Sequence, residues 1–247
     1  MPGIVAPHAR PALLAAALLL PGFAAPAFAQ DDGGLSASVE VASDDRRRGL
    51  SWSSGDPVLR ASVSVPVADG LVLDATGVSL RGSRRHGGAD GVIDLRAGYT
   101  RQTGAWSLTA DATYHAFPGA SGQGYAELGA GAGFLIGPAN IGAFARYAPR
   151  QDAIGGDNLY LGAETSLGIP GTPFTVSGHV GRSSGSVRDP MRAWRLRPDG
   201  RYWDHGVALD YRRGQWAAGL RYADSSIDPG ASDHAGATLV ARFGIDF

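Results

Sequence analysis

Hydrophobic and polar residues alternate along most of this chain with a period of two. The last segment shows it most clearly: in HAGATLVARFGIDF, Ala235, Leu239 and Phe243 share one apolar face, and Arg242 lies on the other. Successive side chains of a β-strand point to opposite faces, so this period predicts strands and not helices. Twelve segments follow the pattern: 35–41, 59–67, 71–80, 93–100, 106–115, 126–134, 141–147, 159–167, 174–180, 207–211, 216–222 and 234–247.

The connections between these segments alternate in length. Those after the even-numbered segments up to the tenth are short, as in Ala68-Asp69-Gly70, and the others are longer and rich in Gly, Ser, Asp, Arg and Pro. A soluble β-sandwich has no reason to sort its loops in this way, whereas membrane barrels have short periplasmic turns and longer extracellular loops. The sequence therefore predicts an all-β fold, a transmembrane, antiparallel, up-and-down β-barrel of about twelve strands.

Aromatic residues on the outward face are predicted to form two girdles at the strand ends. Amphipathic rings favour the headgroup layers on both sides of a membrane, and the middle of each strand here carries Ala, Leu, Val and Ile. The girdle residues beside the short turns are Tyr99, Trp106, Phe134, Phe174, Tyr211, Trp216 and Phe247. Those beside the long loops are Tyr114, Tyr147 and Tyr222.

The first residues are typical of a cleaved secretory signal peptide. A weakly cationic start precedes an apolar run, 13–20, and the cleavage motif Ala27-Phe28-Ala29. These are the three parts of such a signal, and the run is too short to cross a membrane comfortably. We expect a signal peptide at 1–29 and an outer-membrane β-barrel at 30–247. The predicted location is the outer membrane of a Gram-negative bacterium.

Composition narrows the classes of partner and chemistry. The formal net charge of −1 gives no support to a nucleic-acid partner. A secreted chain without cysteine takes its stability from a large core or from a membrane. Asp111 and His115 share a face but lie too far apart along one strand for a hydrogen bond, and no nucleophile motif accompanies His115 or His179. We therefore expect no enzyme, no catalytic or metal-binding residues and no cofactor.

The polar face of the strands is predicted to line the lumen. Twelve strands lie between the filled interior of eight and the wide channel of sixteen. The charges either line a path for solutes or form salt bridges that plug it, and we expect a narrow water-filled pore. The lumen-lining candidates are Arg60, Asp74, Asp94, Arg96, Asp111, His115, Glu127, Arg146, Glu164, His179, Asp210, Arg221 and Arg242.

An arginine-rich loop, 183–201 with the flanking Arg182, is a second candidate site. It either folds inward as a cationic constriction, or binds phosphates of outer-leaflet lipopolysaccharide, or is simply solvated. The three arginines of 46–48 have the same three alternatives, but the neighbouring Asp44 and Asp45 offset part of their positive charge. The candidates in the loop are Arg182, Arg188, Arg192, Arg195, Arg197 and Arg201.

Three stretches resemble the TorF family of proteobacterial outer-membrane porins: SDDRRRGLSWSSGDPVLR at 43–60, GVIDLRAGY at 91–99 and YHAFPGASGQGYAELG at 114–129. The resemblance covers most of the chain after the signal peptide. It implies a porin-like outer-membrane protein and no particular substrate. Asp45 and Arg47 occupy positions where that family tends to have aromatics.

The function expected from these features is a porin-like channel for passive diffusion of small hydrophilic solutes. The alternatives are a non-conducting structural or adhesive barrel and, with less support, an outer-membrane hydrolase. The expected partners are outer-membrane lipid and lipopolysaccharide, the barrel-assembly machinery and the permeating solute.

The last strand is also predicted to carry an assembly signal in Phe243, Ile245 and Phe247, since a terminal aromatic resembles the one that the barrel-assembly machinery reads. Deleting Phe247 should lower the yield of folded barrel in the membrane, measured as the heat-modifiable fraction on a gel. Phe247→Trp, which keeps the aromatic ring, is the control. Normal insertion of the deletion variant would contradict this role.

Overall fold

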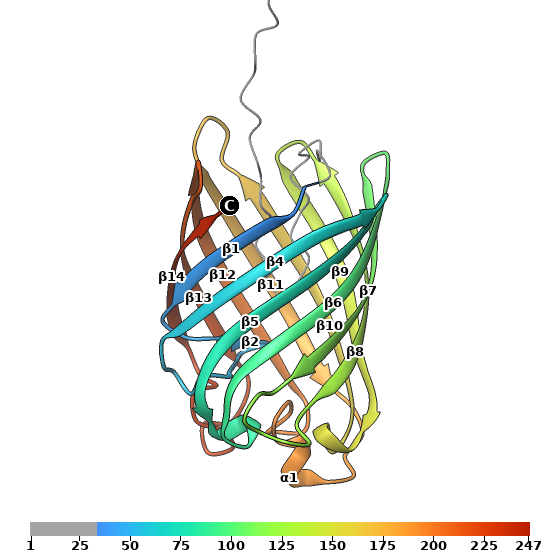
Figure 1. Ribbon diagram of the computed structural model, residues 1–247, viewed down its shortest axis with the longest axis vertical. Coiled ribbons are helices and arrows are strands. Elements are labelled where there is room, and N and C mark those ends of the chain that lie inside the picture. Colours follow the sequence, from blue (N-terminus) through green and yellow to red (C-terminus); the bar gives the residue numbers. More distant parts are fainter. Residues whose placement is uncertain (1–33) are drawn as a thin grey trace, which may run out of the picture.

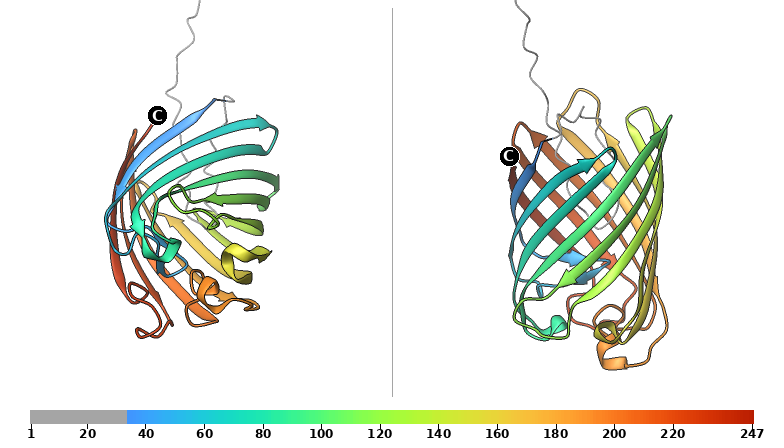
Figure 2. Two further views of the ribbon diagram at one scale, coloured as in Figure 1. Left: turned by 60° about the horizontal axis from the view of Figure 1, so that its bottom comes forward. Right: turned by 45° about the vertical axis from the view of Figure 1, so that its right-hand side comes forward.

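The structure is a computed structural model that describes residues 34–247, so the predicted signal peptide lies outside the described residues. Strands joined edge to edge form a closed barrel (Figures 1 and 2). Its twelve strands are β1 (Ser36–Ala42), β4 (Val58–Ala68), β5 (Leu71–Ser83), β6 (Ala89–Thr103), β7 (Trp106–Ala116), β8 (Tyr125–Ile136), β9 (Ala139–Gln151), β10 (Gly156–Gly168), β11 (Phe174–Ser184), β12 (Tyr202–Arg213), β13 (Trp216–Ser225) and β14 (Thr238–Asp246).

Every pair of neighbouring strands is antiparallel, and the ring closes where β1 meets β14. Val39 lies opposite Ile245 there, and Ala37 exchanges two backbone hydrogen bonds with Phe247. Closure satisfies the backbone of every strand, which a spanning sheet needs because hydrocarbon offers no hydrogen-bond partner. The predicted fold class and strand number are confirmed.

The two ends of the barrel differ, as the loop lengths predict. At the turn end, adjacent strands are joined by tight turns such as Asp69–Gly70, where Gly70 has a φ of 70°. The longer connections gather at the opposite, loop end, which is the bottom of Figure 1. We use "turn end" and "loop end" for these two rims below.

Short elements inside the long connections escape a search for alternation, because each has only two to four residues. They are β2 (Arg46–Arg47), β3 (Leu50–Ser51), the 3₁₀ turns η1 (Arg84–His86) and η2 (Asp152–Ile154), and α1 (Pro190–Ala193). Among residues 34–247, no helix is long and apolar enough to cross a membrane.

The outer wall carries the apolar parity of the strands. Leu95, Leu128 and Leu220 are about half exposed there, and the ten aromatic residues assigned to girdles lie on the same face. Several of these rings pack in pairs across neighbouring strands. Trp106 and Phe134 have ring centroids 4.9 Å apart, and Trp216 stacks on Phe243, also on the outer face, at 5.4 Å.

Ion pairs hold the seam of the barrel together on its inner side. Arg242 of β14 pairs with Glu40 of β1 and with Asp210 of β12, so one guanidinium connects strands on both sides of β14. Replacing Arg242 with Met should leave two carboxylates facing each other and cost about 1–3 kcal/mol. The check is the temperature at which the folded gel band converts to the unfolded one. Arg101→Met, at an exposed position near the turn end, is the control. Equal shifts for both would contradict a special role for the seam.

Candidate functional site: the lumen and the loop inside it

The polar parity of the strands faces the lumen, where its charges form chains that run from strand to strand. On β5, β6, β7 and β9, Arg96 lies 3.0 Å from Asp74 and 3.5 Å from Asp111, which Arg146 also contacts at 2.9 Å. Around the seam, Glu40 joins Arg242 to Arg60. These chains bring together eight of the predicted lumen-lining residues with their partners: Arg60, Asp74, Arg96, Asp111, Arg146, Asp210 and Arg242 directly, and Asp94 through a loop described below.

The remaining candidates occupy other parts of the inner wall. His115 bonds Asp94 at 2.7 Å, and His179 lies 3.3 Å from Asp204. Glu164 is opposite His179 in the register of β10 and β11, and neither it nor Arg221 has an ion pair among the described residues. Within this part of the chain, no group of three or more His, Cys, Asp or Glu could hold a metal ion.

The first loop, residues 43–57, folds into the loop end of the barrel, and we call it the inward loop (Figure 2). Its centre is the β2–β3 hairpin, whose two-residue turn has positive φ at Arg48 (51°) and Gly49 (76°). Positive φ at both positions is the geometry of a tight hairpin turn, which favours glycine. A side chain at Gly49 would also lie 2.9 Å from Asp204, so the turn fits closely against the wall.

Charged side chains of the inward loop reach four different strands. Asp45 is 1% exposed and accepts hydrogen bonds from Arg47, at 3.1 Å, and from Arg60 of β4, at 2.6 Å. Arg47 also donates to Asp94 of β6 at 2.8 Å. Arg48 pairs with Glu127 of β8, and its guanidinium lies 4.6 Å from the centre of the Tyr160 ring on β10. The loop is therefore tied across the lumen by charge.

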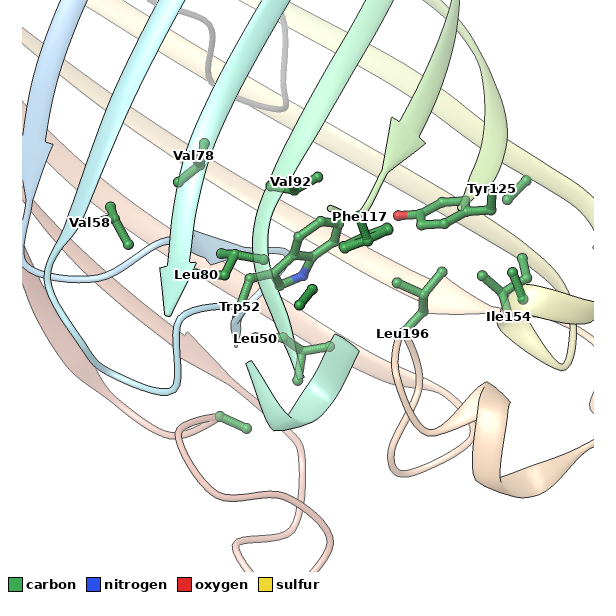
Figure 3. Packing of buried hydrophobic residues seen from close by; sticks show 14 of the residues in the cluster. Leu50, Trp52, Val58, Val78, Leu80, Val92, Phe117, Tyr125, Ile154 and Leu196 are labelled. Carbon is green, nitrogen blue, oxygen red and sulfur yellow. The ribbon is translucent and has the colours of Figure 1, made fainter. Parts of the chain in front are cut away.

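An apolar cluster closes over these ion pairs at the loop end, and we call it the lid. Trp52 of the inward loop is 4% exposed and packs beside Leu80 and Phe117, while Leu196 and Ile154 approach from other connections (Figure 3). The lid therefore draws on several loops that are far apart in the sequence. Burying a contiguous set of large apolar side chains is what holds such loops in one arrangement.

Arginines also fix the lid, through main-chain oxygens. Arg195 donates to the carbonyls of Gln123 and Ala153, and Arg197 donates to those of Asp157 and Ser186. Both side chains are buried, at 4% and 3% exposure. Burial lowers the pKa of Arg195 to about 10, so it remains a cation at neutral pH.

The other members of the arginine-rich loop are placed differently. Arg188, Arg192 and Arg201 are exposed at the loop end. Arg182 is on the outer face of β11, where its guanidinium lies 5.5 Å from the Trp203 ring. The loop thus divides into a buried part within the lid and an exposed part around it.

His86 of η1 is the titratable group at the centre of the lid. Its ring lies 4.3 Å from that of Trp52 and 4.6 Å from that of Phe117, and its Nδ1 is 3.0 Å from Arg195. Burial, followed by the charges of Arg195 and Arg85, holds the pKa of His86 well below its usual value. The imidazole is therefore neutral and serves as the acceptor for Arg195.

Sequence reasoning missed two kinds of residue here. Asp204 and Arg212 face the lumen beyond the segment 207–211, because β12 extends past the clear alternation on both sides. It also left open whether the run Asp44 to Arg48 enters the barrel. The sequence does contain a signal for this. Two acids and three arginines followed by Gly49 are typical of a charged hairpin, and the polar faces of the strands carry charges of both signs that could pair with it.

Replacing Trp52 with Ala should open the lid, because removing a buried indole costs about 3–5 kcal/mol. We expect the inward loop to become sensitive to protease while the barrel keeps its heat-modifiable mobility. Met191→Ala is the matched control, since Met191 is in the same rim but 87% exposed. Unchanged protection in Trp52→Ala would show that the lid does not depend on this ring.

The barrel resembles solved outer-membrane porins. The NanC porin is 13% identical with a TM-score of 0.59, covering 87% of this chain and 99% of the porin. The KdgM porin in complex with disordered oligogalacturonate is 10% identical with a TM-score of 0.56, covering 86% and 97%. An outer-membrane channel from Pseudomonas putida F1 is 12% identical with a TM-score of 0.52, covering 90% and 99%. At these identities the likeness shows a shared fold.

No curated protein matches the chain in sequence. The model of one bacterial family, described as a bacterial protein of unknown function (Gcw_chp), matches residues 27–243. Since the match covers most of the sequence, this protein belongs to the Gcw_chp family.

Proposed function

We propose that this protein is a porin-like channel of the outer membrane through which small hydrophilic solutes diffuse passively. The observation that carries the proposal is the closed barrel whose inner wall bears charged side chains on most of its strands, with a charged loop folded inside. A lipid-facing wall and a hydrated, charged interior are the two requirements of a polar pore. In this orientation the turn end faces the periplasm and the loop end faces outside.

The likeness to porins of the same architecture supports this proposal. One of them has been solved with oligogalacturonate, a hydrophilic solute. The resemblance to the TorF porins in 43–60, 91–99 and 114–129 points the same way, and it remains a prediction. So do the cleaved signal peptide at 1–29 and assembly by the barrel-assembly machinery through Phe243, Ile245 and Phe247.

Lipopolysaccharide is the partner we propose for the exposed arginines around the lid. Arg182, Arg188, Arg192 and Arg201 surround the rim that would meet the outer leaflet. Guanidinium groups bind phosphates through paired hydrogen bonds. The position of Arg182 beside Trp203, on the outer face, suits a headgroup layer where charged and aromatic groups meet.

The lid supports a second candidate, a structural or adhesive barrel that does not conduct. Trp52, His86 and Arg195 are nearly fully buried at the loop end, as expected of a permanent plug. A hydrolase has less support. Within residues 34–247, His115 is hydrogen-bonded to Asp94 and His179 lies beside Asp204, and neither imidazole is hydrogen-bonded to a hydroxyl group.

Conductance separates the two candidates. The mature chain, refolded into planar bilayers, should give discrete current steps, and Trp52→Ala should give larger or longer steps because its lid is weakened. Heat-modifiable mobility confirms that each sample contains folded barrel. Folded protein that gives no steps in either form would replace the channel by the non-conducting barrel.

A further inference from the structure

The inward loop supplies the two middle members of a run of four alternating charges. Arg60 of the wall lies 2.6 Å from Asp45 of the loop, Asp45 bonds Arg47 at 3.1 Å, and Arg47 lies 2.8 Å from Asp94 of the wall. The two outer charges belong to β4 and β6, which are separated by β5. A wall cation and a wall anion are therefore bridged by a neighbouring carboxylate and guanidinium that are not part of the wall.

A second wall carboxylate, Glu127, depends on the loop in the same way. Its partner is Arg48, the residue after Arg47. Without the loop, Arg60 would keep only Glu40, at 3.6 Å, and Asp94 only His115, at 2.7 Å. Glu127 has no other ion pair among the described residues. The wall behind the loop is thus incomplete by one anionic and two cationic groups.

Unused hydrogen-bonding atoms lie in the same place. Glu127 is 2% exposed and its Oε2 is without a hydrogen-bond partner among the described residues. The same holds for Nε2 of His115, which is 8% exposed. Buried polar atoms of native proteins are normally paired, so atoms of this kind mark capacity that a bound group could fill.

We propose that the inward loop acts as an internal pseudo-ligand, and that Arg60, Asp94 and Glu127 form a binding site for a small zwitterion. The solute would carry one carboxylate and two cationic groups, ammonium or guanidinium, taking the places of Asp45, Arg47 and Arg48. This inference rests on the proposed channel and names its solute class. A simple anion would leave Glu127 unpaired and Asp94 with only His115, and a simple cation would leave Arg60 without its second partner, each at the cost of a poorly solvated charge.

Competition between loop and solute gives a distinctive expectation. A ligand that binds only when the loop has left shows an apparent affinity reduced by the fraction of open molecules. Weakening the loop should therefore strengthen binding, whereas ordinary damage to a binding site weakens it.

The test uses the refolded mature chain in detergent, with free L-arginine as the probe and isothermal titration as the measurement. The double variant Asp45→Asn/Arg47→Gln removes the competing charges with little change of shape, and it should bind L-arginine at least about tenfold more tightly than the parent. Adding Asp94→Asn to it should abolish the gain. Agmatine, which lacks the carboxylate, and propionate, which lacks the cation, should bind far more weakly.

Equal or weaker binding of L-arginine by the double variant would overturn the proposal, as would agmatine binding as tightly as L-arginine. No binding to any folded form would overturn it as well. Heat-modifiable mobility verifies folding, and Arg47→Gln alone replaces the double variant if that does not fold. Because the titration needs no membrane, failure here is distinct from an absence of conductance, which would overturn the channel instead.

Discussion

The loop that folds into this barrel is held against the wall by one buried carboxylate. Asp45 is nearly fully buried and lies between the guanidiniums of Arg47 and Arg60, one from the inward loop and one from the wall. A buried charge is tolerated only when it is paired and hydrogen-bonded. Through its two bonds Asp45 joins the loop to β4, and it lies beside the guanidinium that pairs with Asp94 of β6.

The barrel and its lid obey different physical rules. Along the wall, hydrogen bonding between strands is obligatory and side chains sort by parity, so the arrangement is regular. At the loop end, apolar burial around Trp52 and arginine contacts hold together segments with no regular period. Function at this end therefore depends on contacts between loops, which can change without disturbing the barrel.

This division explains how far the sequence could be read. The twelve strands, their closure and the polarity of the inner wall follow from alternation and loop length, and the structure has them. At the loop end, β5, β6, β9 and β10 extend beyond the predicted segments. Residues there, such as Ala89, Val92 and Ala148, belong to the apolar cluster, so apolar and polar side chains no longer alternate between a lipid-facing and a lumen-facing side. Pairings such as Asp45 with Arg60, or Arg48 with Glu127, join residues whose proximity depends on the path of a loop, and no period encodes that path.

Arg195 and Arg197 clamp the lid through carbonyl oxygens, and every residue has a carbonyl oxygen. The partners at Gln123, Ala153, Asp157 and Ser186 contribute no side-chain atom to these particular bonds. Side chains at such positions can therefore be exchanged while the framework of the loop end stays fixed. Arg195 and Arg197 would then hold the loops in the same arrangement even where the side chains of those loops differ.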